Sequence, residues 1–257
     1  MTSTSNDAPL SLRGRTALVT GGSRGIGKAI AESFARAGAN VMISSRKAEE
    51  LEAAAADIGH GAKWCAANVG RPEDAEAAVD ATLAAFGALD VLVNNAATNP
   101  YAGPTIDIDL PRWEKTWQVN LTGPLLLTQC AWRKYMKDGP GGSSVINIAS
   151  VGGYHTNPIL GAYDTTKAAL IHLTKQLAAE LGPNARVNAI CPGLVRTKFA
   201  RALWEGEGGK VVAKTNPTRR IGRPEDVAGL ALFLASDLSA WLTGESILVD
   251  GGQHIAF

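Results

Sequence analysis

The hydrophobic pattern of the chain alternates between two kinds of segment. Short apolar runs, rich in β-branched residues, are typical of buried strands and lie at 16–20, 40–44, 62–67, 91–93, 145–149, 186–191 and 246–249. Longer stretches with apolar residues at helical spacing lie between them, among them 49–58, 72–86, 110–137 and 224–234. Strands that alternate with helices predict an α/β fold, a Rossmann-type doubly wound parallel β-sheet flanked by helices. No repeat or linker interrupts the pattern, so we expect a single domain.

Length, charge and cysteine content agree with this prediction and disfavour several functions. A chain of 257 residues fits one α/β domain, and a net charge of +1 gives no electrostatic reason to bind nucleic acid or an acidic membrane. No apolar run approaches the roughly 18 residues of a membrane span, and the N-terminus lacks the pattern of a signal peptide. Cys65, Cys130 and Cys191 are scattered among apolar residues, which predicts reduced core thiols without a metal or disulfide role. We expect a cytoplasmic protein with a flexible tail over 1–11 and a catalytic domain over 12–257.

A glycine-rich turn follows the first predicted strand. Gly21-Gly22-Ser23-Arg24-Gly25-Ile26-Gly27 separates this strand from a helical stretch that contains Ile30 and Phe34. Strand, glycine turn and helix in this order are the context of a phosphate-binding loop, because glycines let the backbone approach a pyrophosphate at the helix N-terminus. The spacing Gly-x-x-x-Gly-x-Gly departs from the common Gly-x-Gly-x-x-Gly fingerprint. We predict a dinucleotide site here.

The second predicted strand leads into Ser45-Arg46-Lys47. In NAD-binding domains an acidic residue about 20 residues after the glycines binds the ribose 2′-hydroxyl, whereas an arginine accommodates a 2′-phosphate. The first acidic residue here is Glu49, and Arg24 in the glycine turn adds a second cation. We therefore predict NADP(H) as the preferred cofactor, with NAD(H) possible. The alternative interpretation is that Arg46 and Lys47 only solvate the start of a helix.

Three residues suggest acid–base chemistry. Tyr163 and Lys167 are four apart in a predicted helix, so their side chains lie one above the other. A nearby cation favours the phenolate, which predicts that Lys167 lowers the pKa of Tyr163 from its usual value near ~10. Ser150 ends the strand at 145–149 and could hold a carbonyl oxygen beside the phenol. The alternative is an ordinary helix start with a surface lysine. Asn120, unusual inside the helical segment 110–137, predicts a kinked, functional position.

With these motifs and with Asn94-Asn95-Ala96 and Pro192-Gly193 in the same order, the chain resembles the short-chain dehydrogenase/reductase family over about residues 12–252. The resemblance implies that Tyr163 is the general acid in carbonyl reduction and that Ser150 polarises the carbonyl. It implies that Lys167 binds the nicotinamide ribose and that Asn120 holds a water connecting Lys167 to solvent.

The resemblance also implies a set of cofactor contacts. They comprise Gly21, Ser23, Arg24, Gly25, Ile26, Gly27, Ser45, Arg46, Lys47, Asn68, Val69, Asn95, Ala96, Ala97, Tyr163, Lys167, Pro192, Gly193, Val195 and Thr197. Two of these depart from the family pattern. Asn68 stands where an aspartate usually holds the adenine, and Ala97 replaces a common glycine.

The expected substrate wall lies near the catalytic stretch. It comprises Ser150, Tyr154, His155, Asn157, Leu160 and Trp204, with Tyr101 as a further candidate. A mostly apolar and aromatic lining suits a ketone, aldehyde or dicarbonyl with a hydrophobic body. The glycine-rich region 199–220 is expected to form a mobile lid over this wall, the alternative being a surface insertion.

Several functions fit the resemblance. Stretches at 43–47, 151–155 and 192–204 resemble NADP-dependent carbonyl and retinal reductases within the family. Reductases of 3-oxoacyl thioesters on acyl carrier protein share the same skeleton, and Arg133, Lys134 and Lys137 form a modest basic patch for an acidic carrier. A sensor or scaffold that binds nucleotide without turnover is the alternative from another class. The resemblance further implies a homo-oligomer, a tetramer or a dimer, and a small-molecule carbonyl substrate.

Overall fold

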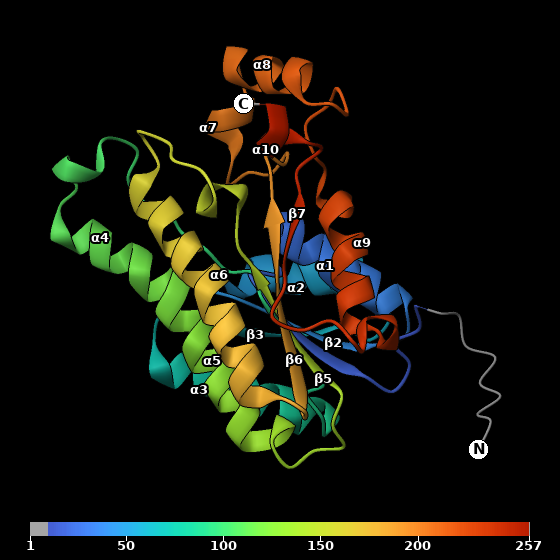
Figure 1. Cartoon of the computed structure of the whole chain (residues 1–257). Helices are drawn as coiled ribbons and strands as arrows, with labels where there is room; N and C mark the ends of the chain where they lie inside the picture. Colours follow the sequence, from blue (N-terminus) through green and yellow to red (C-terminus); the bar gives the residue numbers. More distant parts are fainter. Residues whose placement is uncertain (1–9, 257) are drawn as a thin grey trace.

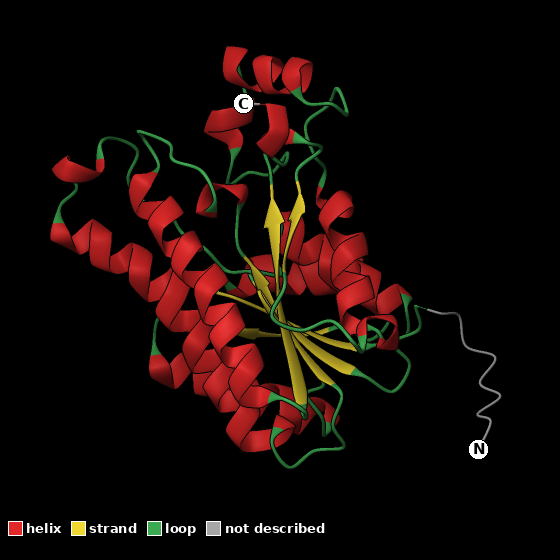
Figure 2. Ribbon diagram, viewed as in Figure 1, coloured by secondary structure: helices red, strands yellow, loops and turns green. Residues whose placement is uncertain are grey.

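A computed structural model describes residues 10–256 and contains a seven-stranded sheet in the order β3-β2-β1-β4-β5-β6-β7 (Figure 2). The strands are β1 Thr16–Thr20, β2 Asn40–Ser45, β3 Lys63–Ala66, β4 Val91–Asn94, β5 Ser143–Ile148, β6 Ala185–Pro192 and β7 Ser246–Val249. All neighbouring strands are parallel. This confirms the predicted doubly wound sheet. Most of the predicted tail over 1–11 lies outside the described residues.

Helices cover both faces of the sheet (Figure 1). One face packs against α1 Gly25–Arg36, α2 Ala48–Ile58 and α9 Pro224–Ala235. The other face is covered by α3 Pro72–Phe86, α4 Leu110–Trp117, α5 Gly123–Ala131 and α6 Gly161–Leu181. Helix α3 begins with proline at its first position, where the missing N–H costs no hydrogen bond, as its sequence predicted.

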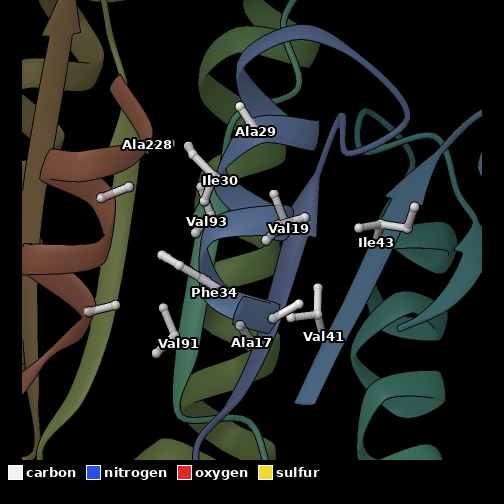
Figure 3. Close-up of a cluster of buried hydrophobic side chains, with 14 of the residues drawn as sticks. Ala17, Val19, Ala29, Ile30, Phe34, Val41, Ile43, Val91, Val93 and Ala228 are labelled. Atoms are coloured by element: carbon white, nitrogen blue, oxygen red, sulfur yellow. The ribbon is translucent and has the colours of Figure 1, made fainter. Parts of the chain in front are cut away.

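The core under α1 shows why the central strands read as continuous apolar runs. Ala17 and Val19 of β1 face Ile30 and Phe34 of α1, while Leu18 points to the opposite cluster (Figure 3). Both faces of the strand are therefore buried, as expected for a parallel sheet covered on two sides. This packing fixes the start of α1 next to the end of β1.

The predicted helical segment 110–137 is divided in two. Helices α4 and α5 are joined by a π-helical turn over Gln118–Thr122, and a second π-helical turn over Trp132–Met136 follows α5. Asn120, predicted to be a kinked and functional position, lies in the first turn, so the helix is irregular there, and its functional role stays a prediction. Such turns widen the helix and redirect the side chains within it.

The region 199–220 contains two short helices, α7 Arg201–Trp204 and α8 Glu207–Thr215. Together with α10 Gln253–Ala256, they gather beyond the carboxyl ends of β6 and β7 (Figure 1). Of the three glycines of this region, Gly206 precedes α8, whereas Gly208 and Gly209 lie in its first turn, so the region is largely helical and not an irregular loop. Its mobility as a lid stays a prediction.

The three cysteines differ in their environment. Cys191 is buried, whereas Cys65 and Cys130 are half-buried, so the prediction of core thiols is right only for Cys191. All three thiols are free. Within residues 10–256, no helix is both long and apolar enough to cross a membrane.

Candidate active site

A cavity of about 900 Å³ lies at the carboxyl ends of the strands. The strand order reverses between β1 and β4, and ligands of open α/β sheets bind at such a switch point. The loops after β1 to β6 all contribute to the wall. The predicted site residues that line it are Gly21, Ser23, Arg24, Gly25, Ile26, Ser45, Arg46, Lys47, Asn68, Val69, Asn95, Ala96, Ala97, Ser150, His155, Asn157, Leu160, Tyr163, Lys167, Pro192, Gly193, Val195 and Thr197.

The glycine turn is held open toward this cavity by the loop after β4. Gly21 and Gly25 have φ angles of +64° and +57°, which side chains other than glycine rarely adopt. The Asn95 side chain donates a hydrogen bond to the Thr20 carbonyl (2.8 Å), and Thr20 Oγ1 accepts one from the Ala96 N–H (3.1 Å). The bare backbone at the start of α1 therefore lines the cavity and fits a pyrophosphate group.

Gly27 has a different role from the one predicted. It does not line the cavity, and a Cβ at this position would overlap the Gly21 carbonyl oxygen and the Asn95 amide nitrogen. The absence of a side chain allows close packing of α1 against the glycine turn. The predicted direct cofactor contact of Gly27 is therefore wrong.

Three cations and one carboxylate line the cavity beyond β2. Glu50 pairs with Lys47 (2.9 Å) and lies 3.5 Å from Arg24, and the Lys47 ammonium lowers the pKa of Glu50. Among the described residues, Arg46 makes no ion pair and is exposed. The sequence analysis identified the cations but not Glu50, whose side chain reaches them from the first turn of α2.

Ser150, Tyr163 and Lys167 meet on one wall of the cavity. Ser150 follows β5, and its Oγ accepts a hydrogen bond from the Gly152 N–H (3.0 Å). Lys167 is buried, and its ammonium donates to the Ile148 carbonyl (2.7 Å) while lying 5.4 Å from the centre of the Tyr163 ring. The i, i+4 spacing on α6 thus places phenol and ammonium in one site, next to the end of β5.

Burial dominates the protonation of both residues on α6. It raises the pKa of Tyr163 above its ordinary value, an effect that interaction with the Ser150 side chain partly offsets. It lowers the pKa of Lys167 to about 8. The pKa of Tyr163 is thus shifted in the direction opposite to the predicted lowering, because burial disfavours the charged phenolate. The phenol keeps its proton.

Asn120 supports the site without lining the cavity, through hydrogen bonds to Thr98 and Thr166. Its Oδ1 accepts from the Thr98 N–H (2.8 Å), and its Nδ2 donates to the Thr98 carbonyl (2.9 Å) and to Thr166 Oγ1 (3.1 Å). The residue is buried and does not line the cavity. Asn120 therefore ties the loop after β4 to α6. Its predicted contact with a water stays a prediction.

Three residues predicted for the substrate wall turn away from the cavity. The Tyr154 hydroxyl donates to the Ser246 carbonyl (3.2 Å), and the Trp204 indole donates to the Thr197 carbonyl (2.8 Å). The Tyr101 hydroxyl donates to the Pro104 carbonyl (2.9 Å). None of the three lines the cavity, so their placement on the wall is wrong. The tyrosine hydroxyls and the indole N–H instead hold loop segments in place through these hydrogen bonds.

Other lining residues had no signal in the sequence. The Phe199 ring lies 6.0 Å from the Tyr163 ring and supplies the aromatic surface that Trp204 was expected to give. Gln253 of α10 accepts a hydrogen bond through Oε1 from the Leu194 N–H (2.9 Å). Gly193 leaves room for this contact, because a Cβ there would lie 2.7 Å from Gln253 Oε1. The last turn of the chain therefore holds the loop after β6.

Comparison with known proteins gives a consistent result. A family model described as "Enoyl-(Acyl carrier protein) reductase" matches residues 21–254. The chain is 40% identical over 257 residues to dehydrogenase/reductase SDR family member 4 of Sus scrofa, which covers 98% of this chain and 91% of that protein. A short-chain type dehydrogenase/reductase from Mycobacterium ulcerans has 36% identity and a TM-score of 0.90, covering 96% of this chain and 92% of that chain. A dehydrogenase/reductase from Sinorhizobium meliloti 1021 has 34% identity and a TM-score of 0.89, covering 95% and 97%.

Proposed function

Because the chain belongs to the short-chain dehydrogenase/reductase family, we propose that it is an NADP(H)-dependent oxidoreductase that interconverts a carbonyl compound and its alcohol. One observation carries this proposal. Ser150, Tyr163 and Lys167 line the same cavity as the glycine turn and Arg46, which forms no ion pair with another described residue. A cavity that joins a proton donor to a dinucleotide-sized cradle suits transfer of a hydride and a proton to one substrate.

The roles of the side chains follow from their environment. NADPH, when bound, supplies the hydride. Tyr163 holds a proton at Oη, and its raised pKa keeps that proton in place until a carbonyl oxygen gains negative charge. Ser150 Oγ orients and polarises that oxygen. The Lys167 ammonium stabilises the phenolate that remains and binds the nicotinamide ribose, and Asn120 fixes the start of α6 through Thr166.

The substrate we propose is a ketone, aldehyde or dicarbonyl with a hydrophobic body. Leu160, Phe199 and Leu203 line the cavity, with the Phe199 ring 6.0 Å from the Tyr163 ring, and their apolar side chains suit such a body. A relative named dehydrogenase/reductase SDR family member 4, at 40% identity, supports oxidoreductase activity. A panel of ketones, dicarbonyls, retinal and acetoacetyl thioesters, each with NADPH and NADH and followed by absorbance, tests the proposal. The proposal would be refuted if the protein reduced none of these compounds with either nucleotide.

Reduction of a 3-oxoacyl thioester is the second candidate. The name of the matching family model refers to acyl carrier protein, which supports a carrier-bound substrate, although that name describes reduction of an enoyl group. The predicted basic patch is weaker than its sequence suggests, because Lys134 pairs with Glu76 (2.8 Å) and Asp80 (2.7 Å). An acidic carrier would have to displace these carboxylates. The free carbonyl compound is therefore the better supported substrate, and catalysis is better supported than a role as a nucleotide-binding scaffold.

Arg46→Ala is expected to weaken NADPH binding roughly tenfold or more and to change NADH binding little. A charge-assisted hydrogen bond to a phosphate contributes about 1.5–3 kcal/mol, and only NADPH carries the 2′-phosphate. Glu50→Gln should shift the NADPH/NADH preference the other way, because it removes the carboxylate that competes for Arg24 and Lys47. Dissociation constants from nucleotide fluorescence measure both effects.

Arg36→Ala is the matched control for Arg46→Ala, since Arg36 is exposed at the far end of α1. It should leave both dissociation constants unchanged. Equal losses of NADPH and NADH binding in Arg46→Ala would show that Arg46 does not select the 2′-phosphate.

Gln253→Met is expected to weaken NADPH binding about fivefold, because it removes one neutral hydrogen bond to the loop expected to hold the nicotinamide end. Gln253→Glu keeps an acceptor of the same length for the Leu194 N–H and should restore binding. Calorimetric titration of each variant with NADPH measures the effect.

The control ligand for these variants is 2′-phospho-ADP-ribose, which lacks the nicotinamide ring. Its dissociation constant should be the same in both Gln253 variants and in the parent. A loss that affects both ligands alike would contradict a role confined to the loop after β6.

A further inference from the structure

Asp164 is a buried carboxyl group that the proposed mechanism does not use. It directly follows Tyr163 on α6, is 7% exposed and lines the same cavity. Its backbone N–H donates to the Leu160 carbonyl (2.9 Å), an ordinary helical bond between residues four apart. The side chain is therefore the part that requires an explanation.

The Asp164 carboxyl group lies next to Ser150. Gly152, in the turn after Ser150, has no side chain, and a Cβ there would overlap Asp164 Oδ1 and lie 3.4 Å from Ser150 Oγ. The Asp164 carboxyl oxygen and the Ser150 hydroxyl thus both lie next to the position that a Cβ of residue 152 would occupy. Only glycine at position 152 leaves room for this arrangement.

The carboxyl group has no partner within the described residues. Asp164 Oδ2 is buried without a hydrogen bond, and none of the ion pairs among residues 10–256 includes Asp164. Burial accordingly raises the pKa of Asp164 to about 7. A buried polar group without a hydrogen-bond partner destabilises the folded protein, and a buried carboxylate does so more strongly. A bound ligand that donates a hydrogen bond to the Asp164 carboxyl group would offset part of this destabilisation.

We propose that Asp164 is a specificity-determining residue that binds a hydrogen-bond donor, a hydroxyl or ammonium group, on the carbon next to the reacting carbonyl. This inference rests on the proposed function, because it takes the carbonyl oxygen to lie between Ser150 and Tyr163. A substituent on the adjacent carbon then reaches the Gly152 side of Ser150, where Asp164 Oδ1 lies. The preferred substrates are α-hydroxy ketones and α-amino ketones.

The test compares 2-hydroxyacetophenone with acetophenone, which differ only in the donor. Dissociation constants are measured in the Tyr163→Phe background loaded with NADPH, so that no turnover interferes. The parent site should bind the hydroxy ketone roughly tenfold more tightly, the value of one hydrogen bond to a charged group. Asp164→Leu, of similar size but apolar, should reduce that ratio to about one while acetophenone binding changes little.

Asp164→Asn extends the test if Asp164→Leu does not fold. The amide should keep part of the preference for the hydroxy ketone and lose the preference for 2-aminoacetophenone, whose ammonium needs a carboxylate. Glu180→Gln, which changes an exposed carboxylate on the same helix, should alter neither ratio. Equal binding of the two ketones by the parent site, or an unchanged ratio in the Asp164 variants, would overturn the assignment.

The test of Asp164 and the test of the proposed function use separate measurements, so the failure of one can be distinguished from the failure of the other. Reduction of acetophenone by the unmodified enzyme with NADPH tests the oxidoreductase activity. The ratio of dissociation constants tests Asp164 without turnover. A purely structural role of Asp164 would change the melting temperature of its variants but leave the ketone ratio unchanged.

Discussion

Tyr163→Phe is expected to lower kcat for carbonyl reduction by roughly a thousandfold, because phenylalanine has no proton to give to the developing alkoxide. The ring keeps its packing, including the contact with Phe199 at 6.0 Å between centroids. NADPH binding should therefore stay within about threefold of the parent value. Stopped-flow absorbance gives the rate of hydride transfer, and nucleotide fluorescence gives the dissociation constant.

Tyr135→Phe is the matched control for this change. Tyr135 lies in the π-helical turn after α5, where its hydroxyl interacts with Asp90 at 3.4 Å, and it does not line the cavity. The same chemical change there should leave kcat unaltered. Turnover by Tyr163→Phe at the parent rate would remove Tyr163 from the role of general acid, whatever its position.

Lys167→Met is expected to lower kcat/KM roughly a hundredfold, because the variant loses the only cation proposed to stabilise the tyrosinate. It should also weaken NADPH binding, unlike Tyr163→Phe, since Lys167 is proposed to contact the ribose as well. Burial lowers the pKa of Lys167 to about 8, so its ammonium is present below that pH and lost above it. In the parent, NADPH binding should thus weaken as the pH rises through about 8. Lys167→Met should lack this dependence.

Stability separates this effect from misfolding. Folding lowers the pKa of Lys167, so at neutral pH the folded state carries the cost of a desolvated ammonium. Lys167→Met should therefore melt no lower than the parent at pH ~7. Lys175→Met, an exposed lysine on the same helix, should leave activity and its pH dependence unchanged. A large fall in melting temperature together with lost activity would point to a structural role.

The sequence was most informative where function depends on local geometry. The glycine turn after β1, the four-residue spacing of Tyr163 and Lys167, and the irregular helix at Asn120 all follow from contacts within one or two elements. For the charged residues near the end of β2, the sequence analysis identified the cations but not the carboxylate. The cations are those at 24, 46 and 47, and the carboxylate is Glu50, which the first turn of α2 places against Arg24 and Lys47. The NADP(H) preference therefore stays a prediction.

Side-chain direction in loops was the main source of error. Tyr154 and Trp204 are close in sequence to predicted site residues, which placed them on the substrate wall. Their polar atoms instead bond to Ser246, which lies 92 residues away, and to Thr197. Nothing in the local pattern specifies such a partner. The local pattern likewise does not indicate that Phe199 lies beside Tyr163, with 6.0 Å between the two ring centroids.

The sequence by itself determined the alternation of strands and helices, the backbone freedom of the glycine turn, and which reactive groups share a helix face. These properties depend on steric and periodic rules that act over a few residues. Tertiary structure alone decided that the last turn of the chain holds the loop after β6 through Gln253, 59 residues from Leu194. It also decided that Asp164 lies against Gly152 and that its Oδ2 finds no hydrogen-bond donor among residues 10–256. Burial and the pairing of polar groups depend on which distant segments the sheet order brings together.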